Sequence, residues 1–321
     1  MHNLVTALTP YIYLSLLNCE TKNGLIMKES IDNTPTFVLK NYTSSKAFIY
    51  YTSEINKLND ALLFDLNRMA IGAFESIFTF KKTPLEEYPK STAWLLIKCY
   101  YAAFFSAHVI IRLFGKALIQ LEQKQVSKLN SGFVYSQISL PPNISIKKGL
   151  SLFSFEKDSN EFNIQLLNNG THEDTWNIFA TLLKEMESNF LRNTSMPTTM
   201  KNDASTLITE YLDVLSNSNH KPNMNWLSQM RNDINYKHTF GSWFPHKETR
   251  KSRDQIISLI KDWDKCNSIN LYTDDLTKFV NGCLFTINLM KNLITILNQK
   301  SLTNYYLQHG AMKVLKVSLT G

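Results

Sequence analysis

The sequence predicts an all-α fold, a mainly helical bundle that carries a small β-prone insertion and an N-terminal extension. Two observations lead to this fold class. The chain contains only 10 Gly and 9 Pro in 321 residues, while Leu, Ile, Lys and Asn recur throughout, a balance that favours long helices over sandwiches or barrels. Long segments also repeat apolar residues at every third or fourth position, which is the helical period.

The N-terminal part of the chain gives a mixed signal before the first long helix. Residues 1–52 form an N-terminal extension in this prediction, with short strands at 36–40 and 47–52, where aromatic and β-branched side chains cluster. From Ser53 onwards apolar residues recur at three- and four-residue spacing. This pattern predicts a helix of about seven turns that ends before Pro84.

A second long helix is predicted over residues 92–122, after Pro89. Its apolar side chains cover most of the circumference, which is typical of a helix with neighbours on several sides. The run from 94 to 114 is long enough to span a bilayer. It contains Lys98 and Arg112, however, and each charge costs about 2.5–3.5 kcal/mol at the centre of a membrane helix. The sequence therefore predicts a buried core helix in a soluble protein, with no membrane partner.

Helical periodicity is lost over residues 125–170, which are interpreted as a small insertion with hairpins because Gly and Pro punctuate β-prone runs at 133–140 and 149–155. Later helices are predicted at 175–190, 204–215, 224–236, 252–265 and 273–298. The resulting organisation is an extension at 1–52, a helical domain at 53–300 containing the insertion, and a tail at 301–321. The end of the tail, 312–319, is interpreted as a strand.

Charge and cysteine content restrict the function classes only loosely. The formal charge is +7, and the sequence pI is about 9.0, which permits a polyanionic partner without requiring one. Only six basic residues are Arg, so their positions carry more information than those of the lysines. The four cysteines are widely spaced and form no CxxC pair; they are expected to be buried free thiols in a reducing compartment, at Cys19, Cys99, Cys266 and Cys283.

One segment of the sequence suggests chemistry. On a helix, Arg231, Asn235 and His238 lie at positions i, i+4 and i+7 beside an apolar stripe. An Arg can hold two phosphate oxygens, and a His with an ordinary pKa of about 6.5 can exchange a proton near neutral pH. The RNA 2′-hydroxyl is a built-in nucleophile, so such a pair would suffice for metal-independent cleavage.

The same residues resemble a known family. Arg231, followed by Asn232 and then, after six intervening residues in all, by His238, is similar to the R-x(4–6)-H motif of HEPN domains, which are helical ribonucleases of prokaryotic toxin–antitoxin and defence systems. The segment 99–115, CYYAAFFSAHVIIRLFG, resembles the buried Tyr-rich helix that precedes this motif. The resemblance covers residues 53–300 as a helical frame and leaves the insertion unmatched.

The resemblance implies a metal-independent endoribonuclease that acts as a cytoplasmic homodimer without a cofactor. Arg231 would bind the scissile phosphate, His238 would act as general base or acid, and Asn232 with Asn235 would orient them. The protein would be the toxin or effector of a bacterial defence or toxin–antitoxin system. Its partners would be RNA and a cognate antitoxin or defence-system protein.

Residues near the motif are candidates for substrate binding. Tyr236, with Trp243 and Phe244, has an aromatic ring that can stack on bases, although packing against the core explains at least two of the three rings. A basic run then opens the next helix, where cations oppose the helix dipole and indicate an external anion or, alternatively, a solvated face. Its members are Lys247, Arg250, Lys251 and Arg253.

Other interpretations remain open on sequence alone. Arg231 can pair with a carboxylate, Asn235 can end the helix, and His238 can interact with the C-terminal helix dipole, as in ordinary bundles. His172 lies at a helix start, where capping explains the acids that follow it, and His108 is expected to be a core histidine. The rival functions are a non-catalytic subunit that binds RNA or a partner protein, and a scaffold without a nucleic-acid role.

Overall fold

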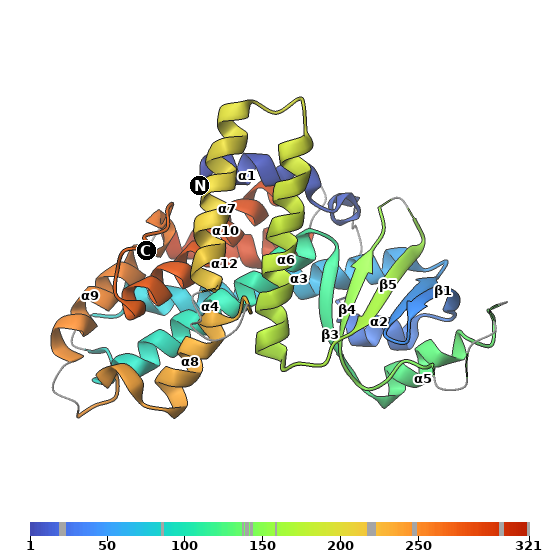
Figure 1. The fold of residues 1–321 in the computed structure, drawn as a ribbon, viewed down its shortest axis with the longest axis horizontal. Helices are drawn as coiled ribbons and strands as arrows, with labels where there is room; N and C mark the ends of the chain where they lie inside the picture. The colour runs from blue at the N-terminus through green and yellow to red at the C-terminus, as the bar shows by residue number, and fades with distance from the viewer. Residues whose placement is uncertain are drawn as a thin grey trace.

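The protein is a mixed α/β structure, mainly helical, with one five-stranded antiparallel sheet (Figure 1). The computed structural model describes residues 1–18, 24–84, 87–136, 138, 141, 144–157, 159–216, 223–245, 249–301 and 305–319. The structure is about 64% helical and 11% strand. The all-α fold class predicted from the sequence is therefore wrong.

The sheet has the strand order β1-β2-β5-β4-β3, and all neighbouring strands are antiparallel. The strands are β1 (Val38–Ser44), β2 (Ala47–Tyr51), β3 (Lys116–Leu121), β4 (Gly149–Phe155) and β5 (Glu161–Leu166). The central pairing of β2 with β5 joins residues more than 100 positions apart, for example Phe48 with Ile164. The N-terminal residues and the insertion thus build one sheet rather than two separate additions.

The strand β3 corrects the predicted length of the second long helix. That helix ends at Leu113, not at residue 122, and Gly115 follows it with φ +72°, a left-handed conformation that favours glycine. Residues 116–121 are apolar enough to continue a helix, but they pair with β4. Periodicity did not distinguish the two states because the strand partner lies in another part of the chain.

The described chain also contains twelve α-helices. They are α1 (His2–Leu8), α2 (Met27–Asn33), α3 (Ile55–Lys82), α4 (Thr92–Leu113), α5 (Gln123–Ser131), α6 (Thr171–Arg192), α7 (Thr198–Leu215), α8 (Trp226–Tyr236), α9 (Thr249–Lys261), α10 (Asp275–Lys300), α11 (Tyr305–His309) and α12 (Ala311–Leu319). Short 3₁₀ helices lie at Thr9–Tyr11, Leu14–Asn18, Thr239–Gly241 and Trp263–Lys265.

Two segments that were predicted as β structure, 312–319 and 133–140, differ from the prediction or lie partly outside the described residues. The strand predicted at 312–319 is wrong, because this segment is helical and packs on α3, with Met312 and Leu315 buried at helical spacing. In the predicted β-prone run 133–140, residues 133–135 form turns. Residues 137, 139 and 140 of that run lie outside the described residues.

Helix α4 is the centre of the fold, as its uniform hydrophobicity predicts. It packs between α3 and α10 and also contacts α6, α8, α9 and β3. Helices α4 and α10 are long and apolar enough to cross a membrane, but their apolar windows are 78% and 72% buried inside the protein. The N-terminal helix α1 belongs to the same core, because its Leu4 and Leu8 are fully buried and it packs on α7.

The sheet lies at one end of the molecule, and α8 and α9 lie at the other, with α6 and α7 standing as an antiparallel pair between them (Figure 1). Arg112 connects α4 to the sheet. Its guanidinium donates to the backbone oxygens of His108 (3.1 Å) and Leu118 in β3 (3.5 Å). These bonds hold the C-terminal end of α4 against the sheet.

Candidate functional site

Arg231, the residue that the motif singled out, is a buried cation on α8. Only 8% of its surface is exposed. Nη1 donates to Oδ1 of Asn232 (2.7 Å), while Nη2 donates to the hydroxyl of Tyr101 (2.9 Å) and approaches Nε2 of His172 (2.9 Å). None of these three partners is a carboxylate.

His172 is supplied by the first turn of α6 and sits against the aromatic face of α4. Its ring centroid lies 4.4 Å from that of Phe104 and 5.9 Å from that of Tyr101. The guanidinium of Arg231 can only donate, so Nε2 of a neutral His172 accepts and Nδ1 carries the proton. Nδ1 then donates to the hydroxyl of Tyr100, 2.9 Å away.

Tyr100 anchors this arrangement from inside the core. The indole Nε1 of Trp176 also donates to its hydroxyl (3.1 Å), and the Ser228 side chain on α8 hydrogen-bonds to it. Burial raises the pKa of Tyr100, so its hydroxyl stays protonated and has a proton to give to Ser228. Tyr100 therefore fixes the imidazole orientation of His172 and does not titrate near neutral pH.

His172, Ser228 and Arg231 border a polar cavity of about 470 Å³ between the start of α6 and the face of α8. The lining residues are Gly170, Thr171, His172, Glu173, Asn223, Asn225, Ser228, Gln229, Arg231 and Asn232. The first-turn N–H groups of α6 have no side-chain cap, because Gly170 occupies the N-cap position. A long helix thus presents its positive end to the cavity that holds the buried Arg231.

The electrostatics of the cavity favour an anionic ligand. Among the described residues Arg231 forms no ion pair, and its Nε is buried without a hydrogen-bond partner. Burial, and secondly the charge of Arg231, lowers the pKa of His172 to about 4, so this imidazole is neutral at pH 7. One carboxylate, that of Glu173, lines the cavity and accepts a hydrogen bond from Nδ2 of Asn223 (3.0 Å).

Among the described residues, the hydrogen-bond partners of the Arg231 guanidinium are Asn232, Tyr101 and His172 rather than the predicted His238. Helix α8 ends at Tyr236, and His238 adopts a left-handed conformation (φ 53°), so the i+7 relation that assumed a continuous helix is broken. The imidazole of His238 is exposed and lies edge-on to Trp243, with ring centroids 5.6 Å apart. Of the four predicted catalytic residues, Arg231 and Asn232 line the cavity, whereas Asn235 and His238 are not among its described lining residues.

The predicted substrate-binding residues are distributed over two places. The ring centroid of Tyr236 lies 5.8 Å from the Arg231 guanidinium carbon. Arg253 on α9 donates to the backbone oxygen of Tyr88 (3.1 Å), away from α8. Lys247 lies outside the described residues, and for Arg250 and Lys251 only the helical backbone of α9 is described.

No family model, curated protein or solved structure matches this chain. The HEPN resemblance therefore rests on the motif residues and on the Tyr-rich helix alone.

Sequence reasoning missed His172 as a functional candidate, because it tested His residues only for metal-ligand spacing and for their place on the motif helix. The local signal was its position just after Gly170 at a helix start. That signal does not reveal that α6 and α8 meet on α4, which brings His172 to Arg231 across 59 positions. The other sequence interpretation of a histidine is confirmed: His108 is buried, with Nε2 3.2 Å from the hydroxyl of Thr175.

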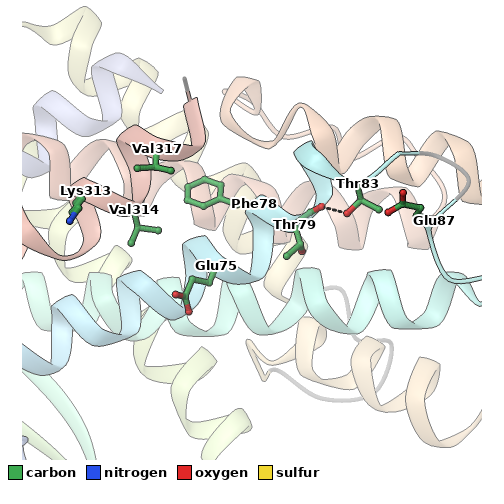
Figure 2. A pocket seen from close by; sticks show the side chains of 8 residues that line it. All are labelled: Glu75, Phe78, Thr79, Thr83, Glu87, Lys313, Val314 and Val317. Carbon is green, nitrogen blue, oxygen red and sulfur yellow. Dashed lines mark hydrogen bonds between the residues drawn. The ribbon is translucent and has the colours of Figure 1, made fainter. Parts of the chain in front are cut away.

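A larger groove of about 580 Å³ lies elsewhere, between α3 and α12 (Figure 2). Phe78, Val314 and Val317 give it an apolar lining, and Glu75, Glu87 and Lys313 lie along it. None of the described residues that line it is a histidine or an arginine. Among the described residues no three His, Cys, Asp or Glu side chains come together in a way that could hold a metal ion.

Proposed function

We propose that this protein is a metal-independent endoribonuclease that cleaves RNA in the cavity between α6 and α8. Arg231 holds the scissile phosphate, together with the N-terminal N–H groups of α6. His172, and not His238, exchanges the proton. The observation that carries the proposal is a guanidinium that is 8% exposed and has only neutral hydrogen-bond partners, beside a neutral imidazole.

The chemistry follows from how these groups share hydrogen bonds. A phosphate that accepts the Nη2 hydrogen bonds of Arg231 frees Nε2 of His172 from its contact with the guanidinium. The added negative charge then raises the pKa of this imidazole. Nε2 then accepts the proton of the 2′-hydroxyl as the 2′-oxygen attacks phosphorus. The bond to the 5′-oxygen breaks, and the departing oxygen takes up a proton from water, while the His172 imidazolium returns its proton to the solvent. The products are a 2′,3′-cyclic phosphate and a 5′-hydroxyl.

The cellular role rests on the family resemblance alone. We propose a cytoplasmic, homodimeric toxin or effector of a bacterial defence or toxin–antitoxin system, controlled by a cognate partner protein. A nuclease that attacks cellular RNA needs such control.

The test compares four purified proteins on total cellular RNA with EDTA present: wild type, Arg231→Ala, His172→Ala and His238→Ala. We expect cleavage with 2′,3′-cyclic phosphate ends from wild type and His238→Ala, and no cleavage from the other two. His238→Ala serves as a matched control, because it removes an exposed imidazole near the site. Loss of cleavage in His238→Ala with retention in His172→Ala would return the role to the motif histidine.

The second candidate is a non-catalytic subunit that binds RNA through the same cavity. The observation that favours it is the pKa of His172, because an imidazole with a pKa of about 4 is a weak base. In that case wild type would bind RNA with a strong salt dependence, lose this affinity in Arg231→Ala, and leave the RNA intact.

A further inference from the structure

An exposed group of aromatic side chains lies at the start of α4, outside the cavity. Trp94 is 55% exposed and Phe244 is 57% exposed, although both are large hydrophobic residues. Trp243 directly precedes Phe244 in the sequence and contacts Trp94, with ring centroids 5.2 Å apart. The Nζ of Lys90 lies 5.1 Å from the ring centroid of Phe244. We call these four residues, Lys90, Trp94, Trp243 and Phe244, the aromatic platform.

The platform has a defined geometry because several hydrogen bonds hold its two segments together. Ala93 N donates to the oxygen of Ser242, and Phe244 N donates to Oγ of Ser91, both at 3.0 Å. The indole of Trp243 donates to the oxygen of Ile234 in α8 (2.7 Å). Core packing was expected for at least two of Tyr236, Trp243 and Phe244, but Tyr236 and Phe244 are exposed.

The platform continues towards the cavity along one face of α4. Trp94 and Tyr101 are seven residues apart, so they lie on the same side of the helix, separated by about 10 Å along its axis. The Tyr101 hydroxyl accepts a hydrogen bond from Arg231. About three nucleotides of a stacked strand, or fewer of an extended one, cover such a distance.

Charge complementarity identifies the occupant. The path begins at the exposed Lys90 and ends at the buried Arg231, with aromatic rings between the two cations. Alternation of cations and rings suits a polyanion whose bases are unpaired, because a phosphate needs the cations and an exposed base can stack on a ring. Bases inside a duplex are already stacked and do not offer these faces.

We propose that the aromatic platform is a base-stacking subsite, and that the substrate of this protein is single-stranded RNA whose unpaired bases near the scissile phosphate stack on Trp94. This inference rests on the proposed function for the location of the phosphate. The platform selects the strand state of the RNA rather than its sequence, since every base has a face that can stack.

The test measures binding of a short unstructured RNA, made resistant to cleavage by 2′-O-methyl groups, by fluorescence anisotropy. We expect Trp94→Ala to bind about 5- to 150-fold more weakly than wild type, the range for loss of one stacked base. Trp94→Phe keeps a ring and should restore most of the affinity. Tyr272→Ala is the matched control, because Tyr272 is 97% exposed elsewhere and its loss should leave affinity unchanged.

An abasic walk along the same RNA then locates the stacked base. In wild type, one or two adjacent abasic positions should weaken binding, and in Trp94→Ala the same substitutions should have no further effect, because the two partners of one contact are coupled. Additive losses, or wild-type affinity in Trp94→Ala, would overturn the proposal. A changed sedimentation coefficient in Trp94→Ala with unchanged RNA affinity would assign the face to contact between protein copies and would also overturn it.

Cleavage assays on the same variants separate this proposal from the proposed function. If Arg231→Ala abolishes cleavage while Trp94→Ala cleaves and binds as wild type does, the nuclease assignment stands and the platform assignment fails. If wild type binds single strands through Trp94 but cleaves nothing, the platform assignment stands and the nuclease assignment fails.

Discussion

Arg231→Met should remove RNA binding with little loss of stability. The side chain that Met replaces is buried and donates three hydrogen bonds to uncharged acceptors. Hydrogen bonds from a charged group contribute about 1.5–3 kcal/mol each, while burying the guanidinium costs several kcal/mol. These terms nearly cancel, and Met can fill much of the same volume. We expect the free energy of unfolding to change by less than about 2 kcal/mol.

The loss of phosphate binding in Arg231→Met is not offset in this way. When two guanidinium N–H groups that hold a phosphate are removed, the binding free energy of that phosphate weakens by about 3 kcal/mol or more. RNA affinity should therefore fall by about 100-fold or more. Urea unfolding followed by circular dichroism gives the stability change, and fluorescence anisotropy gives the affinity change.

Arg192→Met is the matched control. Arg192 is exposed at the far end of α6, about 30 Å along the helix from His172. The same substitution there should change neither quantity. A loss of 3–5 kcal/mol in Arg231→Met, with RNA affinity of the folded protein unchanged, would refute the reasoning, because that is the signature of a broken structural contact.

Three further predictions concern the charges and thiols. Glu173→Gln should tighten RNA binding severalfold in low salt and less in high salt, because it removes the like charge from the cavity; unchanged affinity at both salt concentrations would contradict this. Burial lowers the pKa of His108 and His172, so the unfolded chain binds more protons below pH 6.5. Stability should therefore decrease as pH falls from 6.5 towards 4, by about 1.4 kcal/mol per pH unit for the buried His108 and by less for the half-exposed His172. His108→Gln should remove most of this slope in urea titrations, and an unchanged slope would argue against the assignment. Burial raises the pKa of the Cys266 thiol to about 12 and that of Cys283 well above its usual value, so a thiol-reactive dye at pH 8 should label them roughly a thousandfold more slowly in the folded protein than in urea; equal rates would show that these thiols are accessible.

The sequence by itself determined the features of this protein that depend on residues close together along the chain. The central position of α4 follows from apolar side chains around its whole circumference, and α3, α7 and α10 follow from three- and four-residue spacing. Arg231 was identified for a related reason, since a rare Arg on an amphipathic helix is visible without knowledge of its partners.

The sheet was decided only by the tertiary structure. Its strands are five to seven residues long and come from three separate regions of the chain. Such segments are stabilised by strand pairing and by burial, and both depend on partners that lie far away in sequence. The β3 segment shows this most clearly, because its local pattern also suits a helix.

The histidine of the candidate site was likewise decided by packing. His238 appeared to face Arg231 only while the helix was assumed to continue, and the left-handed turn at its position breaks that relation. His172 reaches Arg231 because α6 and α8 both pack on α4. A helix fixes the relative positions of residues within a few turns, whereas contacts between helices are set by the packing of the whole core.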